Sequence, residues 1–294
     1  MLWVAATLLA AAAQTGRNLA QAGLTVRLGT LGATQVRFLY GLPFALAFLA
    51  LAAWIAGRAP PVPSWSALLP LALGGVAQIG ATALMLATMA RRGFAVSTAW
   101  LKTEPVLIAL TALMLGERLN LQEGAGIVIA TAGVILTGRV DAARGFGPVL
   151  TGLAAAAGFG ISAIAFRAGI LALEEPDPFL AAMTGLAVSL SVQVVLLTLW
   201  LRIFRPGSMT ATLGEWRSSV AAGFLGAFAS SMWFLAFALA TAAAVRTLGL
   251  VDVLLAAVLA RALHGERAPR RALIGMAVIV LGVGLLLVGQ GSGL

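Results

Sequence analysis

Residues 95–138 read AVSTAWLKTEPVLIALTALMLGERLNLQEGAGIVIATAGVILTG, and a second copy of this stretch appears later in the chain. The copy covers residues 244–287 and aligns without a gap at an offset of 149, which places Gly116-Glu117-Arg118 on Gly265-Glu266-Arg267. In the same register, Gly126 falls on Gly275 and Gly133 on Gly282. Self-similarity at a fixed offset indicates a repeated structural unit, so the stretch predicts a chain of two related halves.

The composition is that of a membrane protein. Hydrophobic residues make up 61% of the 294 positions, charged residues 10%, and the mean hydropathy is +1.02, whereas a soluble domain is only about 45–50% apolar. Apolar stretches of about 17 to 25 residues, each able to cross roughly 30 Å of hydrocarbon as a helix, recur along the chain. We predict ten such spans, at residues 2–23, 33–56, 66–89, 94–115, 121–139, 148–171, 179–202, 217–239, 244–263 and 270–289.

The repeat divides these spans into two sets of five. We assign residues 1–140 to the first five-helix repeat, 141–147 to a polar linker and 148–294 to the second repeat, all within one integral membrane domain. Because five is an odd number, the second repeat enters the membrane from the opposite side, which is the inverted topology typical of secondary transporters. The predicted fold class is therefore an all-α membrane protein with ten transmembrane helices in two inverted repeats.

Two pairs of stretches carry a resemblance to a known family. They are EPVLIALTALMLGERL followed by GAGIVIATAGVIL, and in the second half LLAAVLARALHGER followed by GMAVIVLGVGLLL. The chain resembles the drug/metabolite transporter superfamily in its ten-helix EamA-like branch. The resemblance implies a central cavity between the halves, alternating access and a small metabolite as substrate. The second half departs from the pattern, because Val253-Leu254 stands where the first half has Glu104-Pro105.

The most informative residues inside a span are two charged ones and a proline, Lys102, Glu104 and Pro105. Charges within spans are costly and mark functional sites, and Pro105 disfavours helical geometry at Glu104. A helix broken at membrane depth is tolerated where it lines a cavity. Lys102 then contacts the substrate, or alternatively extends to the membrane interface. Glu104 contacts the substrate or carries a coupling proton, or alternatively anchors the broken backbone or pairs with an arginine.

Polar residues in other spans extend the candidate site. In the first span, Gln14, Arg17, Asn18 and Gln21 follow one helical face, which meets either a wet, substrate-binding cavity or neighbouring helices. Asp252 in the ninth span is a proton-coupling candidate, because a buried carboxylate can load and release a proton. Pairing with Arg246 would instead hold Asp252 ionised.

Aromatic residues and one further arginine complete the set of candidates. Trp100 and Trp233 fall inside spans, and either line the substrate pocket or pack against lipid or protein. We interpret Arg37 and Tyr40, one turn apart in the second span, as helix anchors. Gly126 and Gly133 lie on one face of the fifth span, and Gly275 with Gly282 on the tenth, so these faces are expected to approach neighbouring helices closely.

Several function classes fit the sequence poorly. No HExxH, P-loop or nucleophile motif is present, and a chain with one histidine and no cysteine offers no multi-histidine or thiolate metal site. We expect no catalytic residues, cofactor or metal, and the +9 net charge reads as topology-setting charge instead of a nucleic-acid surface. An intramembrane enzyme remains a minor alternative.

The expected function is secondary transport, with export as the expected direction, of a small polar metabolite. Amino acids or related zwitterions lead, since cationic Lys102 and Arg17 and anionic Glu104 and Asp252 together suit both charges of such a solute. A drug, sugar, nucleoside or quaternary amine is the alternative. We expect a multi-pass protein of a bacterial inner membrane, monomeric or homodimeric, with protons as the candidate coupling ion.

Two indications of membrane orientation disagree. The connections after odd-numbered spans carry twelve arginines and those after even-numbered spans carry three, so the positive-inside rule places the odd connections in the cytoplasm. The family resemblance implies the reverse, with both termini inside.

Overall fold

The computed structural model is helical throughout the residues it describes, which are 1–89, 101–114, 120–137, 147–264 and 269–291. The helices, in chain order, are α1 (Leu2–Leu39), α2 (Leu42–Ala56), α3 (Trp65–Met89), α5 (Glu104–Met114), α6 (Leu121–Thr137), α7 (Gly147–Leu171), α8 (Pro178–Phe204), α9 (Pro206–Gly214), α10 (Trp216–Leu239), α11 (Ala242–Leu248), the 3₁₀ turn η2 (Gly249–Val251), α12 (Asp252–His264) and α13 (Arg270–Gly291).

Length and composition fit the predicted membrane protein. Within the described ranges, seven helical segments are long and apolar enough to cross a bilayer, and Leu121–Thr137 is a shorter apolar helix. The predicted count of ten is therefore approximate. Residues 94–100 of the predicted fourth span lie outside the described part of the chain, and α5 forms its second portion.

The first two predicted spans are joined more tightly than expected. The connection predicted between residues 23 and 33 is a sharp kink at Gly29, whose φ is 68°, and the two helical parts of α1 meet there. Glycine adopts this left-handed geometry without a steric penalty, so a single residue turns the chain. The helix α9 was not predicted, and the Tyr40 hydroxyl donates to the Thr212 carbonyl of α9 at 3.1 Å, which agrees with an anchoring role for Tyr40.

The helix contacts follow the two-repeat symmetry. The most extensive contacts join α1 to α10, α3 to α7 and α6 to α13, so each joins one repeat to the other. In the predicted span order, α1 corresponds to α7 and α3 to α10. Exchanging equivalent helices therefore turns the contact of α1 with α10 into that of α7 with α3, as a pseudo-two-fold axis requires.

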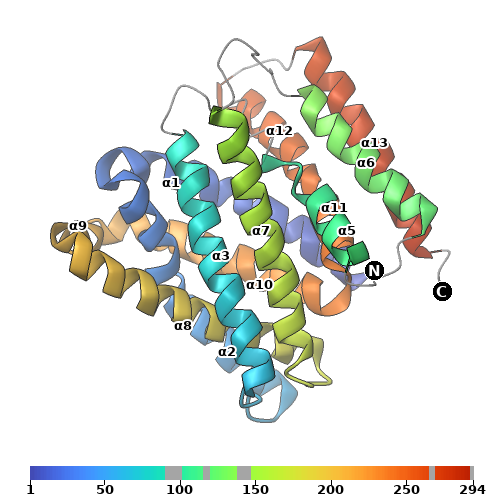
Figure 1. Ribbon diagram of the computed structural model, residues 1–294. Helices are drawn as coiled ribbons and strands as arrows, with labels where there is room; N and C mark the ends of the chain where they lie inside the picture. The colour runs from blue at the N-terminus through green and yellow to red at the C-terminus, as the bar shows by residue number, and fades with distance from the viewer. Residues whose placement is uncertain (90–100, 115–119, 138–146, 265–268, 292–294) are drawn as a thin grey trace.

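The helices α6 and α13 lie side by side along one edge of the molecule (Figure 1). The predicted close approach of their glycine faces is observed. A Cβ atom added to Gly133 would lie 2.6 Å from the backbone nitrogen of Ile279, and one added to Gly282 would lie 2.3 Å from that of Ala130. In lipid, where apolar helices gain little from leaving the solvent, such backbone contact is a principal source of helix association.

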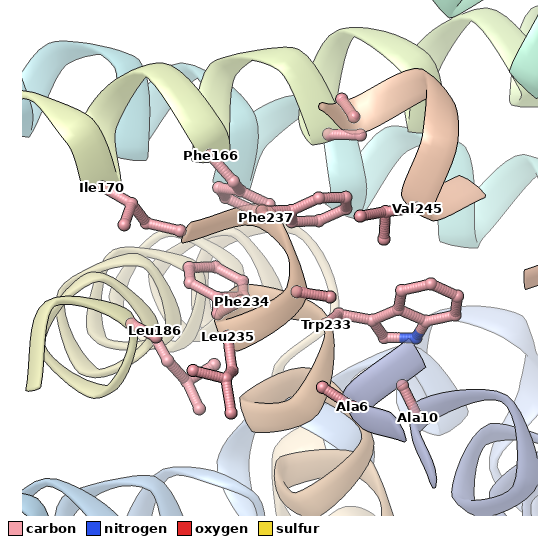
Figure 2. Close-up of a cluster of buried hydrophobic side chains, with 14 of the residues drawn as sticks. Ala6, Ala10, Phe166, Ile170, Leu186, Trp233, Phe234, Leu235, Phe237 and Val245 are labelled. Atoms are coloured by element: carbon pink, nitrogen blue, oxygen red, sulfur yellow. The ribbon is translucent and has the colours of Figure 1, made fainter. Parts of the chain in front are cut away.

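The main apolar core lies beside α10 and positions one wall of the site. Figure 2 shows side chains of α1, α7, α8, α10 and α11 converging there. The rings of Phe166 and Phe234 are 4.6 Å apart between centroids, and Trp233 and Phe237 stack at 6.3 Å. Such ring contacts add to the packing of the aromatic side chains and hold α7 against α10.

Candidate functional site

A cavity of about 110 Å³ lies between the two repeats. Its walls come from α1, α3, α5, α7, α10 and the α11–η2–α12 segment. In the part of the chain that the structure describes, its charged lining residues are Arg17, Arg37, Lys102, Glu104, Arg246 and Asp252. Charged groups at membrane depth are expensive, so their convergence on one cavity marks a candidate functional site.

Two of these charges lie where the helices α5 and α12 begin. The chain turns at Lys102 and Thr103, and α5 begins at Glu104 with Pro105 in its first turn. In the second repeat, η2 separates α11 from α12, which begins at Asp252. The backbone N–H groups of Gly249 and Asp252 bond within the segment, so α11, η2 and α12 form one continuous span that tightens at η2. The turn before α5 and the tightened turn η2 each place an acidic side chain at the cavity.

The turn in the fourth span was predicted from Pro105, and the 3₁₀ turn η2 in the ninth span was not. No proline lies in residues 242–264. The signal there is Gly249, because a Cβ atom added at this position would lie 2.5 Å from Cη2 of Trp233. The indole packs directly on the backbone of the turn, which only glycine permits.

Lys102 and Asp252 form an ion pair across the cavity, between the first repeat and the second. Their side chains are 20% and 10% exposed, so both charges are largely enclosed by protein. The second carboxylate oxygen of Asp252, Oδ1, is buried and has no hydrogen-bond partner among the described residues.

Arg246 and Glu104 form the second ion pair between the repeats. Arg246 Nε lies 2.8 Å from Glu104 Oε1, and both side chains are nearly buried. The guanidinium also lies over Trp233, 4.7 Å from the ring centroid, which is a favourable cation–π arrangement. The partnership of Asp252 with Arg246 that the sequence suggested as one possibility is replaced by Lys102–Asp252 and Arg246–Glu104.

The polar face of the first span also meets this cavity. Gln14, Arg17 and Asn18 all line it. Arg17 Nη2 donates to Asn18 Oδ1 at 2.8 Å, and Trp233 Nε1 donates to Gln14 Oε1 at 3.2 Å. The face therefore contacts both the cavity and α10. The side chain of Gln21 lies outside the described residues.

Arg37 is the main residue whose position the sequence did not predict. It was interpreted as a helix anchor, and in addition it is only 6% exposed and lines the cavity. Its Nη1 donates to Thr82 Oγ1 on α3 at 3.3 Å. The signal that marks it is the same as for Arg17, an arginine within an apolar span.

Among the nine residues singled out from the sequence, Trp100 lies outside the described part of the chain. The other eight line this one cavity: Gln14, Arg17, Asn18, Lys102, Glu104, Pro105, Trp233 and Asp252. They come from α1, α10 and the predicted fourth and ninth spans. Residues up to 238 positions apart (Gln14 to Asp252) therefore meet at one place.

Comparison with known proteins is consistent with this geometry. The EamA-like transporter family matches residues 1–139 and, separately, residues 147–288, which are the two repeats. The chain belongs to the EamA-like transporter family. A solved structure titled only "Crystal structure of protein" superposes with a TM-score of 0.68 at 20% identity, covering 97% of this chain and 99% of its own. That likeness concerns the fold, and no curated protein matches the sequence significantly.

Membership in the EamA-like transporter family, together with the apolar helices, makes this chain a multi-pass membrane transporter of the drug/metabolite transporter type. The members of this family are transporters and not enzymes. The cavity between the two matched repeats is thus the natural place for a transported molecule, since carriers built from inverted repeats bind their substrates at the repeat interface.

Proposed function

We propose that this protein is a secondary transporter of the bacterial inner membrane that exports a small polar metabolite, an amino acid or a related zwitterion, by alternating access. The observation that carries the proposal is the cavity between the repeats, in which charges of both signs stand beside the turn before α5 and the 3₁₀ turn η2. Broken helices at the repeat interface are the typical substrate sites of such carriers.

The two ion pairs give the proposal a mechanism. Each pair joins the first repeat to the second, so both are affected when the repeats rock against each other. A solute with a carboxylate can replace Asp252 as the partner of Lys102, and a solute with an ammonium can replace Arg246 as the partner of Glu104. Exchange of protein partners for solute partners lowers the cost of separating buried charges.

Gln14, Asn18 and Trp233 complete the proposed binding surface. The amide side chains offer both donors and acceptors, and the indole offers an apolar face. Asp252 is the proposed proton-coupling residue, with Glu104 as the second candidate. Asp252 Oδ1 has no hydrogen-bond partner among the described residues, while its other oxygen faces Lys102.

The test is counterflow of a pooled set of labelled amino acids into proteoliposomes, comparing the wild type with Lys102→Ala. We expect accumulation by the wild type and a loss of at least tenfold in the variant. Arg58→Ala is the matched control, because Arg58 is half-exposed and pairs with Glu175 away from the cavity.

The outcomes separate the parts of the proposal. Accumulation that does not depend on Lys102 would keep the carrier but remove Lys102 from its site. No accumulation by a folded preparation would exclude amino acids as the substrate class. Export predicts, in addition, that cells producing the wild type release a preloaded labelled solute faster than cells producing Lys102→Ala.

A further inference from the structure

The charges that line the cavity do not balance. Lys102 pairs with Asp252 and Arg246 with Glu104, which accounts for both carboxylates. Arg17 and Arg37 remain, and in the described part of the chain neither has a carboxylate partner. They are 3% and 6% exposed, so water screens them little.

The two unbalanced arginines are close to each other. Their side chains flank Gly226 of α10, where an added Cβ atom would lie 3.4 Å from Arg17 Cδ and 3.6 Å from Arg37 Cγ. Arg246 is also near enough for its charge to repel both of them. This side of the cavity is a concentrated positive region, and buried like charges favour an anion between them.

Arg17 has donors available for such an anion. Of its guanidinium nitrogens, Nη2 donates to Asn18, whereas Nε and Nη1 are buried without an acceptor in the described residues. Buried donors are normally satisfied, and a buried cation normally has a counter-charge. The planar guanidinium matches the geometry of a carboxylate, and the group lines the cavity.

From these observations we infer that the transported solute binds as a net organic anion, with an acidic group on Arg17 and the extra positive charge of Arg37 balanced by a second acidic group. The inference rests on the proposed function and narrows its substrate class. The substrates it favours are the acidic amino acids and, outside the amino acids, dicarboxylates. Phe159, Phe166 and Phe234 supply an apolar wall for the carbon skeleton.

The experiment compares isosteric solutes that differ in charge. Counterflow into proteoliposomes is measured for labelled glutamate against glutamine, for aspartate against asparagine, and for succinate. We expect the acidic member of each pair to be carried at least tenfold faster than its amide, and succinate to compete with it. Thermal stabilisation of the detergent-purified protein by glutamate, and not by glutamine, is the matching binding measurement.

Variants assign the selectivity to its residues. Arg17→Gln is expected to lose at least tenfold in glutamate counterflow and to abolish stabilisation by glutamate, while Arg17→Lys, which keeps the charge, recovers part of both. Arg27→Gln is the control, because Arg27 is exposed, pairs with Glu215 and does not line the cavity. Its glutamate counterflow should equal that of the wild type.

The results that overturn the inference differ from those that overturn the proposed function. Counterflow of glutamine equal to or faster than that of glutamate would leave a working amino-acid carrier and refute a net-anionic solute. Glutamate counterflow unaffected by Arg17→Gln would refute the assignment of Arg17. A folded protein that carries neither member of any pair would refute both the inference and amino acids as the substrate class.

Discussion

At the scale of single residues, Asp252 is the group on which proton coupling depends. We predict that Asp252→Asn, which removes the titratable carboxylate, abolishes uphill accumulation driven by an imposed pH gradient but keeps solute counterflow, because exchange without net transport needs no proton release. The measurement is labelled-solute uptake into proteoliposomes with and without the gradient. Glu104→Gln, the parallel change in the other ion pair, removes the proposed partner of the solute's ammonium, so it is expected to lower counterflow and gradient-driven uptake to the same extent.

The opposite pattern would change the assignment. Loss of gradient-driven uptake without loss of counterflow in Glu104→Gln alone would move the proton to Glu104. Loss of counterflow as well in Asp252→Asn would show that the carboxylate serves binding through Lys102. The folded state of each variant is verified by its elution as a single species, since removing one partner of a buried ion pair costs about 3–5 kcal/mol.

The charged residues of the cavity could be identified from the sequence, but their ion-pair partners could not. Lys102, Glu104 and Asp252 were identified because charge is rare in apolar spans, and all three line the cavity. Their pairing depends on how the two repeats are placed against each other, and Lys102 and Asp252 are 150 positions apart. Arg37 was assigned to anchoring because it lies near the start of its span, where a snorkelling side chain is equally common.

At the scale of helices, the glycine contact between α6 and α13 carries a stability prediction. Gly282→Ala would place a Cβ atom 2.3 Å from the backbone nitrogen and 2.7 Å from the Cα of Ala130. Backbone atoms cannot move aside as a flexible side chain can, so the helices must separate. We expect a loss of about 1–3 kcal/mol, seen as a lower apparent melting temperature in detergent.

Gly284 on the same helix is the matched control. A Cβ atom there would meet nothing within 4 Å, and alanine is favoured over glycine in a helix by about 0.5–1 kcal/mol. Gly284→Ala should therefore leave the melting temperature unchanged or raise it. Equal effects of the two substitutions would contradict the close contact as the reason for the glycines.

Turns within the spans were predictable only where a local signal exists. Pro105 lacks an N–H group and disfavours helix at Glu104, so the break before α5 was visible in the sequence. The 3₁₀ turn η2 begins at Gly249, on which Trp233 packs, a contact between helices that no local pattern encodes. The bend at Gly29 lies in the connection predicted between the first two spans, so the sequence indicated where the chain turns but not the single glycine that turns it.

At the scale of the whole molecule, the repeat was the most reliable feature of the sequence. The offset that aligns Gly133 with Gly282 predicted two halves, and the family matches the same two stretches separately. An internal duplication is encoded along the whole chain and does not depend on any single contact. The solute has no such encoding, because it is recognised by a few side chains whose arrangement follows from the tertiary structure.

Alternating access can be tested with single introduced cysteines, because the chain has none of its own. Ser230 and Ser231 are neighbours on α10, but only Ser230 lines the cavity, while Ser231 donates to the Phe228 carbonyl at 2.8 Å. We expect Ser230→Cys to react with a membrane-impermeant thiol reagent both in intact cells and in inverted membrane vesicles, because the cavity opens to each side in turn. Ser231→Cys should react at least tenfold more slowly in both.

Reaction of Ser230→Cys from one side only would contradict alternating access through this cavity. Equal reaction of both cysteines would contradict the boundaries of the cavity itself.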